Sequence, residues 1–284
     1  MYDVAIIGSG PAGLSAAINL KQRNKEIIWF GSAELSAKVQ MSEKVANYPG
    51  LGLIPGGELN KKFSEHAKEI GLDPVSQMVT AIMPMGSSFS IAAGTDAYEA
   101  KAILLATGVM SGKTFAGETE YIGRGVSYCA TCDGYLYKGK TIAVYCGSKR
   151  YEEEGEYLAE IAGKVYLFPG YKDCDINLPN VEVMTEKIDS VVGEMKMTGI
   201  KLKNDDTLSV DALFCLRDAI SPGTLVPGIE MNGNHIAVNR DMSTNIPGCF
   251  AAGDCTGMPY QIAKAVGEGN VAAHGIIAYL SESK

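Results

Sequence analysis

A glycine-rich turn near the start of the chain constrains the fold more than any other segment. Residues 8–13 read Gly-Ser-Gly-Pro-Ala-Gly, which matches the pattern G-x-G-x-x-G. Residues 3–7 resemble a short buried strand, with an apolar run over 4–7. Residues 13–23 carry apolar side chains at helical spacing, and residues 26–30 again resemble a strand. The chain therefore opens with a β-α-β unit, which places the glycines between a strand and a helix.

Glycines at this place are typical of a dinucleotide site. The first permits a tight turn, the second lets the backbone approach a pyrophosphate, and the third lets the helix pack on the strand. The helix N-terminus then faces the negative charge. The candidate contacts are Gly8, Gly10, Pro11, Ala12 and Gly13. No acid ends the second strand, so Glu34, slightly beyond it, is the candidate for the ribose contact.

The far end of the chain favours FAD over NAD. Residues 251–254 read Ala-Ala-Gly-Asp and close a predicted strand, and a long helix is expected over 261–280. Gly253 and Asp254 can hold the sugar-like chain of a flavin. The start of the helix, at Gln261 and Ile262, can face the pyrimidine edge of the flavin, where negative charge gathers on reduction. The alternative is that Asp254 only caps a helix.

The remaining pattern repeats the α/β theme. It predicts a helix over 57–70, a β-meander over 75–101, strands over 102–106, 141–145, 164–168 and 249–252, and a helix over 151–162. The expected fold class is α/β, with two Rossmann-like three-layer domains. The expected boundaries are 1–112 with 238–284 for a discontinuous FAD-binding domain, and 113–237 for an inserted domain.

Composition and charge exclude several function classes. The net charge of −8 argues against nucleic acid, which needs clustered Lys and Arg. No apolar run reaches the ~18 residues of a membrane helix, and residues 2–8 reach a glycine too early for a secretory signal. We therefore expect a cytoplasmic protein with no nucleic-acid or membrane partner. Five of the seven cysteines are scattered, which does not suggest a disulfide scaffold.

The other two cysteines, Cys129 and Cys132, have C-x-x-C spacing and are followed by Asp133. This spacing closes a small disulfide that cycles easily. The thiolate performs the exchange, so a group that moves protons is needed nearby, and Asp133 is the candidate acid–base. Two alternatives are a zinc knuckle and a pair of buried structural thiols. The three histidines are isolated and no second C-x-x-C exists, so no metal site is expected.

The motifs together resemble those of the low-molecular-weight thioredoxin reductases. The matching segments span nearly the whole chain: 8–13, 47–50, 106–108, 125–134, 246–254, and 261 with 263. The resemblance implies an FAD domain in two segments, an inserted pyridine-nucleotide domain that carries the cysteine pair, and a homodimer. It also implies FAD contacts at Asn47, Ala106, Thr107, Gly108 and Gln261.

The resemblance also implies roles for the cysteine pair. Cys132 would lie against the flavin and take its electrons, Cys129 would attack the disulfide of thioredoxin, and Asp133 would handle protons. One domain of the family swings relative to the other, so that the pair faces first the flavin and then the partner.

The chain departs from the family where NADPH should bind. After the strand at 141–145 only Gly147 remains of a three-glycine turn, and the helix then opens with three glutamates, which repel phosphate. After the strand at 164–168 the family has a His-Arg-Arg cluster for the 2′-phosphate, whereas residues 168–173 read Phe-Pro-Gly-Tyr-Lys-Asp. NADPH is therefore not expected.

This pattern resembles the ferredoxin-dependent flavin thioredoxin reductases, which keep the fold and lack the nucleotide motifs. The expected partners are thioredoxin as acceptor and reduced ferredoxin as donor. The flavin-side Gly-Gly-Gln of the family is changed to about Ser36-Ala37-Lys38, which makes Lys38 a further cofactor candidate. Three alternatives stay open: an NADPH-dependent enzyme with atypical binding, a disulfide oxidoreductase fed by another flavin, and a non-catalytic flavin-binding redox sensor.

Overall fold

The chain divides into two compact units. The structure is a computed structural model, and it describes residues 1–108, 114–121, 123–128, 130–217 and 222–282. One unit comprises Met1–Val109 and Pro222–Lys284, and the other comprises Met110–Ser221. The chain thus returns to the first unit before the expected boundary at 238. It does so because α6 (Pro222–Leu225) already packs against a strand of the first unit, β3 (Val79–Pro84).

The first unit is built on one six-stranded sheet. Its strands follow the order β2-β1-β5-β4-β3, and β16 also pairs with β5. The further bounds are β1 (Tyr2–Ile7), β2 (Ile27–Phe30), β4 (Phe89–Ala93), β5 (Asp96–Leu105) and β16 (Cys249–Ala251). We expected a β-meander that ends at residue 101 and a separate strand over 102–106, and this expectation is wrong. β5 is continuous because its first half pairs with β4 antiparallel and its second half pairs with β1 and β16 in parallel.

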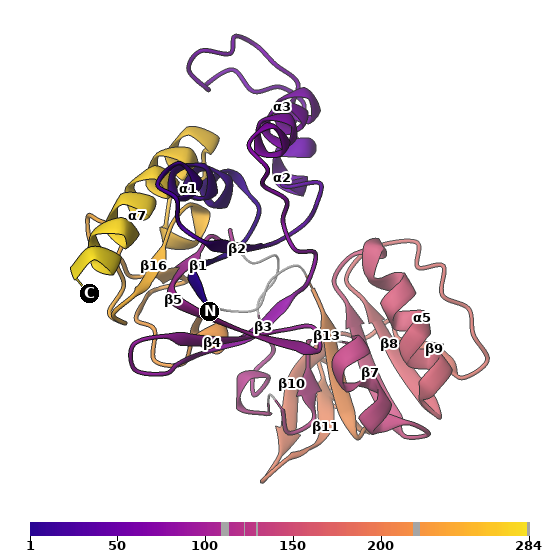
Figure 1. Cartoon of the computed structure of the whole chain (residues 1–284). Helices are drawn as coiled ribbons and strands as arrows, with labels where there is room; N and C mark the ends of the chain where they lie inside the picture. The colour runs from indigo at the N-terminus through magenta and orange to yellow at the C-terminus, as the bar shows by residue number, and fades with distance from the viewer. Residues whose placement is uncertain (109–113, 122, 129, 218–221, 283–284) are drawn as a thin grey trace. The chain divides into compact units, whose positions relative to one another are not determined.

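Two helices, α1 (Pro11–Gln22) and α7 (Ile262–Glu282), pack against each other beside this sheet (Figure 1). Their close approach needs Gly269, because a Cβ there would overlap the carbonyl oxygen of Ala12. Apolar residues of both helices join the strands in one core, including Leu14, Ala16, Leu20, Ala272 and Ile276. The unit also contains α2 (Ala37–Gln40), α3 (Gly56–Glu69), β14 (Met231–Asn232), β15 (His235–Ile236) and the 3-10 turn η4 (Asp254–Thr256).

The second unit contains a parallel five-stranded sheet in the order β6-β13-β7-β8-β9. Its strands are β6 (Val126–Ser127), β7 (Thr141–Cys146), β8 (Lys164–Pro169), β9 (Val181–Val183) and β13 (Ala212–Leu216). A separate antiparallel sheet consists of β10 (Ile188–Gly193), β11 (Met197–Leu202) and β12 (Thr207–Ser209). The helical segments are α4 (Ala130–Asp133), α5 (Glu152–Ile161), η1 (Thr119–Tyr121), η2 (Gly134–Tyr137) and η3 (Lys149–Tyr151).

The parallel strands of the second unit bring the cysteine segment and several residues discussed below to one edge of the sheet. In a parallel sheet all strands end on the same side, and ligands bind outside the carboxyl ends. The cysteine segment follows β6, Arg217 follows β13, Gly147 follows β7 and Tyr171 follows β8. Across the described ranges, neither unit contains a helix that is both long and apolar enough to cross a membrane.

Candidate functional site

The glycine turn of the first unit has one open side and one crowded side. Gly8 has φ +118°, and a Cβ on it would overlap the carbonyl oxygen of Ala106. A Cβ on Gly10, by contrast, would have no heavy atom within 4 Å. Gly10 also caps α1, whose first turn contains Pro11 and no acidic residue. An open approach at Gly10 and a helix start without a side-chain cap or an acidic residue fit a pyrophosphate.

The turn after β2 is held by side chains from two other elements. The hydroxyl of Ser9 donates to the carbonyl oxygen of Leu35 at 2.9 Å. The amide nitrogen of Asn60, a buried residue of α3, donates to the carbonyl oxygen of Glu34 at 2.7 Å. The expected ribose candidate Glu34 therefore lies on an exposed turn that is fixed relative to the glycine turn. Asn60 was not predicted, because one Asn in an amphipathic helix carries no sequence signal.

Two predicted cofactor residues meet at the end of β16. The ammonium of Lys38 lies 2.9 Å from Oδ2 of Asp254, and the side chain of Asp254 is only 15% exposed. Gly253, just before it, has φ +90°, and a Cβ there would lie 2.9 Å from Cβ of Ala12. The Gly253–Asp254 turn therefore approaches the glycine turn closely, and the structure brings both halves of the predicted FAD site together.

A pair of residues one helical turn apart on α7 shapes the turn that carries Asp254. The ammonium of Lys264 donates to the carbonyl oxygens of Gly253 and Gly257, each at 2.7 Å. Oε2 of Glu268 accepts the amide of Gly253 and the hydroxyl of Thr256, both at 2.9 Å. Lys264 and Glu268 also form an ion pair at 3.1 Å. Their i, i+4 spacing was visible in the sequence, but it is typical of ordinary helix surfaces.

The remaining predicted cofactor residues lie in three places. Gln261 accepts the amide of Ala265 at 3.0 Å just before α7 begins, and Ile262 is the first residue of that helix. Residues 106–108 follow β5 directly, and the amide of Ala106 donates to Ile7 at 2.8 Å. Asn47 lies in an exposed loop, and no contact among the described residues joins it to Asp254 or to the glycine turn.

The cysteine segment is described in part. Cys129 and the side chain of Cys132 lie outside the described residues, although the backbone of Cys132 belongs to α4. The carboxylate of Asp133 accepts a hydrogen bond of 2.7 Å from the hydroxyl of Ser127. The predicted acid–base is therefore tied to the end of β6, on the side of the pair that precedes Cys129.

A second carboxyl group, Glu154 of α5, contacts this segment. It accepts a hydrogen bond from the backbone amide of Ala130, which lies inside the C-x-x-C motif. Burial raises the pKa of Glu154, and the hydrogen bond from Ala130 opposes that rise only in part. The sequence indicated Glu154 only as a charge that repels phosphate, so its contact with the cysteine segment was missed.

The other cysteines have the properties of structural thiols. Burial raises the pKa of Cys146 and of Cys249 to about 12, and that of Cys255 to about 11. Cys215 is also fully buried, whereas Cys174 is half-buried. A thiol must ionise before it exchanges with a disulfide, so these buried cysteines are poor candidates for redox work.

The second nucleotide-type turn is filled by its own side chains. Glu152, in the first turn of α5, accepts the hydroxyl of Tyr171 at 2.7 Å and the amide of Asp175 at 3.1 Å. Lys149 forms an ion pair with Asp175. Gly147 is also tight, because a Cβ there would lie 3.2 Å from the carbonyl oxygen of Leu216. The N-terminus of α5 thus already has the Glu152 carboxylate beside it, whereas the first turn of α1 contains no acidic residue.

A protein-family model covers most of the chain. It is described as "Pyridine nucleotide-disulphide oxidoreductase", and it matches residues 2–168 and 176–269. The chain belongs to this family. Among curated proteins, the chain is similar to the thioredoxin reductase of Listeria monocytogenes, 31% identical over 308 residues, with 100% of this chain and 95% of that protein covered. The thioredoxin reductase of Aquifex aeolicus is 36% identical over 276 residues, covering 89% of this chain and 85% of that protein.

Solved structures give a finer comparison within the family. A ferredoxin-flavin thioredoxin reductase from Clostridium acetobutylicum is 47% identical, with a TM-score of 0.93, 99% of this chain covered and 98% of that chain covered. The atypical thioredoxin reductase TRi from Desulfovibrio vulgaris Hildenborough is 31% identical, with a TM-score of 0.67 and 99% of each chain covered.

These matches confirm the expected fold class and the expected resemblance to thioredoxin reductases. As a member of the pyridine nucleotide-disulphide oxidoreductase family and a homologue of thioredoxin reductases, the chain is an oxidoreductase that binds FAD. The contacts of the first unit agree with this assignment, because the open glycine turn and the Asp254 turn suit a dinucleotide. The roles of individual residues remain predictions.

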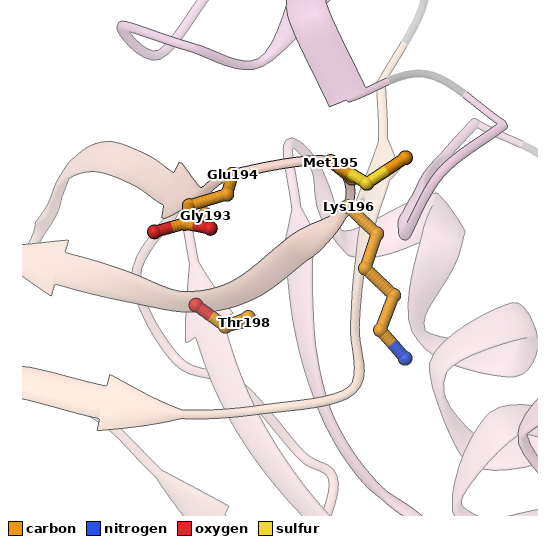
Figure 2. A pocket seen from close by; sticks show the side chains of 5 residues that line it. All are labelled: Gly193, Glu194, Met195, Lys196 and Thr198. Carbon is orange, nitrogen blue, oxygen red and sulfur yellow. The ribbon is translucent and has the colours of Figure 1, made fainter.

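A separate hollow lies on the second unit, away from the residues discussed above. A cavity of about 560 Å³ lies at the β10–β11 hairpin and is lined by Gly193, Glu194, Met195, Lys196 and Thr198 (Figure 2). Met195 is 85% exposed, so the hollow is shallow. Its lining contains no thiol and no imidazole, and we assign it no catalytic role.

Proposed function

We propose that the chain reduces the disulfide of thioredoxin through Cys129 and Cys132, with electrons from reduced ferredoxin that reach the pair through FAD. In this proposal the first unit binds FAD and the second unit carries the redox disulfide. We further predict a homodimer.

The residues that would hold FAD come from three segments of the first unit. The glycine turn, with Gly8 and Gly10, would bind the pyrophosphate. Asp254 would bind the sugar-like chain, and the start of α7 would face the flavin ring. FAD takes up electrons singly or in pairs, which lets a one-electron carrier supply a two-electron disulfide reduction. Glu34 would contact the ribose.

The thiol exchange follows from the cysteine pair itself. The Cys129 thiolate attacks one sulfur of the thioredoxin disulfide, which forms a mixed disulfide and releases the other thioredoxin sulfur as a thiolate. Cys132 then attacks Cys129, which frees thioredoxin as a dithiol and leaves Cys129 and Cys132 joined. Asp133, held by Ser127, gives a proton to a departing thiolate and takes one from an attacking thiol.

The contact between Glu152 and Tyr171 is the main argument against a pyridine nucleotide as the electron donor. A pyridine nucleotide would place phosphate at the start of α5, but Glu152 is already bound there by Tyr171 and by the amide of Asp175. A phosphate brought to this helix start would meet a carboxylate and would also have to break two hydrogen bonds. The similarity to a ferredoxin-flavin thioredoxin reductase supports the same choice.

Flavin reduction under anaerobic conditions tests the proposal. The purified protein is mixed in a stopped-flow instrument with NADPH, NADH or reduced ferredoxin, and bleaching of the visible absorbance of the flavin is followed. We expect rapid bleaching with reduced ferredoxin and none with either nucleotide. Rapid bleaching by NADPH would instead identify an NADPH-dependent enzyme with atypical binding.

A second measurement distinguishes the proposed reductase from a two-flavin enzyme and from a redox sensor. Flavin content per chain is expected to be one, and a value of two would favour a disulfide oxidoreductase fed by a second bound flavin. Steady reduction of thioredoxin in the presence of ferredoxin is expected. If the flavin bleaches and thioredoxin stays oxidised, the protein is a redox sensor or acts on another disulfide.

A further inference from the structure

A fully buried ion pair lies in the second unit, close to the cysteine segment. Glu118 has no exposed side-chain surface, the side chain of Arg217 is 3% exposed, and the two groups lie 2.9 Å apart. Removing two charges from water costs several kcal/mol, which the pair recovers only if its geometry is good and its other hydrogen-bonding groups are satisfied. Neither residue has a part in the exchange described above.

Both carboxylate oxygens of Glu118 are satisfied. Oε2 accepts Nη2 of Arg217 at 2.9 Å and the backbone amide of Phe115 at 2.8 Å. Oε1 accepts the hydroxyl of Tyr128 at 2.7 Å. Burial beside the Glu118 carboxylate raises the pKa of Tyr128, so its hydroxyl stays protonated and remains a donor. The hydrogen bond is charge-assisted and belongs to the strong class.

Two aromatic rings hold the guanidinium of Arg217. Its central carbon lies 5.2 Å from the ring centre of Phe115 and 5.1 Å from that of Tyr145. The two rings themselves meet edge to face, with centres 5.2 Å apart. A planar guanidinium stacks well on aromatic faces, and Lys lacks this geometry. Arg217 is therefore fixed in orientation, and through it Glu118.

This network reaches the redox pair through Tyr128. Tyr128 follows β6 and is the residue next to Cys129. Strand β6 pairs with β13, and Arg217 follows β13 directly. Tyr128 and Arg217 therefore lie at the ends of neighbouring strands. The rest of the segment is held by the bond of Ala130 to Glu154 and by that of Asp133 to Ser127. Among the described residues, Tyr128 is the one whose side chain holds the segment directly before Cys129.

We propose that the Arg217–Glu118–Tyr128 network is a positioning device that fixes the chain at Tyr128, directly before the cysteine pair, and so stabilises the proposed Cys129–Cys132 disulfide. The inference rests on the proposed redox role of the pair. Held groups react as if at high local concentration, and a loosened segment lowers that effective concentration and makes the disulfide easier to reduce.

A redox titration of the FAD-loaded, full-length protein tests this. Protein is equilibrated with mixtures of reduced and oxidised glutathione, so that the disulfide and two glutathione thiols exchange with two protein thiols and one oxidised glutathione. The protein is then quenched in acid and alkylated, and the peptide that contains the pair is quantified by mass spectrometry. We compare the wild type with Tyr128→Phe, which removes only the hydroxyl.

Tyr121→Phe is the matched control. Tyr121 is buried in the same unit, three residues after Glu118, and its hydroxyl donates to the neutral carbonyl oxygen of Gly193 at 2.6 Å, so the variant loses a buried tyrosine hydrogen bond that is not part of the network. Arg217→Lys keeps the charge but loses the stacked, planar group. Melting curves of all variants report any general loss of stability.

Tyr128→Phe is expected to make the disulfide about tenfold easier to reduce, as the loss of a hydrogen bond to a charged group predicts. A tenfold change corresponds to about 30 mV for a two-electron couple. Arg217→Lys should shift the equilibrium in the same direction by less, and Tyr121→Phe should leave it unchanged.

Three results would overturn the inference. An unchanged equilibrium in both Tyr128→Phe and Arg217→Lys shows that the network does not act on the pair. Equal shifts in Tyr128→Phe and Tyr121→Phe show only a general loosening of the unit. A wild-type pair that never cycles between disulfide and dithiol removes the proposed function itself, and the positioning role with it.

Discussion

Lys38 and Asp254 are 216 positions apart in the sequence, and Nζ of the first lies 2.9 Å from Oδ2 of the second. Lys38 comes from α2 and Asp254 from the turn after β16, where Lys264 and Glu268 hold the backbone. The ion pair joins two residues that the sequence singled out for different reasons. It marks the place where the helix after β2 meets the returning C-terminal segment.

Replacing Asp254 tests its part in FAD binding. Asp254→Asn is expected to weaken FAD binding about tenfold, because a hydrogen bond to a carboxylate is worth about 1.5–3 kcal/mol. The lost pairing with Lys38 adds little, since that lysine is 65% exposed. Fluorescence titration of the apoprotein with FAD measures the dissociation constant. Asp241→Asn is the control, because Asp241 accepts hydrogen bonds from Ser243 elsewhere in the same unit, and equal constants for both variants would contradict the assignment.

Replacing two glycines of the same turn by Ala should affect different properties: Gly8→Ala should lower stability, and Gly10→Ala should lower FAD affinity. Gly8→Ala forces a side chain into φ +118° and onto the Ala106 carbonyl, which should cost at least about 1–3 kcal/mol of unfolding free energy. Gly10→Ala meets no such obstacle, since its φ is −68° and its Cβ would stand in open space. The stability of Gly10→Ala without FAD should fall by less than that of Gly8→Ala, by about 1 kcal/mol at most for the poorer N-cap, while its FAD affinity should fall. Urea unfolding of the apoproteins and FAD titration check the pair. If Gly10→Ala binds FAD normally, the pyrophosphate does not lie there.

The cysteine assignment predicts a separation of two half-reactions. Cys132→Ser should leave flavin bleaching by the electron donor intact and lower thioredoxin reduction to background, because the electrons can no longer reach a disulfide. Cys174→Ser, a change at a half-buried thiol outside the pair, should leave both steps unchanged. Stopped-flow absorbance and a thioredoxin reduction assay measure the two steps. Thioredoxin reduction that survives in Cys132→Ser rules out the proposed route.

The raised pKa of Glu154 predicts how stability depends on pH. Its native pKa lies above the ordinary 4.5 because of burial, so between these two values the native state binds more protons than the unfolded state. The free energy of unfolding that this group contributes is therefore full below pH ~4.5 and declines as pH rises through the native pKa. The free energy of unfolding of Glu154→Gln should equal that of the wild type near pH 4. It should exceed the wild-type value increasingly as the pH rises towards 7, because the wild type then carries a buried charge.

Chemical unfolding at several pH values from about 4 to about 8 measures this difference. Glu153→Gln is the matched control, because Glu153 is the exposed neighbour on the same helix turn and its replacement should follow the wild type at every pH. A Glu154→Gln difference that shrinks as pH rises would show that the carboxylate, in its charged form, is stabilised by its surroundings.

Much of the fold could be predicted because its signals are local. The glycine turn at 8–13, the apolar strand before it and the long C-terminal helix each follow from residues close together in the chain, and the structure has them within one or two residues of the expected bounds. The sequence placed the return of the chain to the first unit at residue 238, whereas the first unit resumes at Pro222. The contact that decides it, between α6 and β3, joins segments with no common pattern.

The site divides in the same way. The sequence by itself determined the chemistry on offer: a glycine turn for a pyrophosphate, an acid at the end of a strand, and a closely spaced cysteine pair with a neighbouring acid. These are properties of residue type and spacing, and backbone geometry over a few residues enforces them.

Only the tertiary structure decided which distant groups support that chemistry. Glu118 and Arg217 are 99 positions apart, and nothing around either residue indicates a buried pair. The same holds for Asn60 beside Glu34, and for Glu152 bound by Tyr171. A buried polar group must find its partner wherever the chain's packing brings one within hydrogen-bonding distance, so such pairs depend on the completed fold and leave no pattern in the sequence.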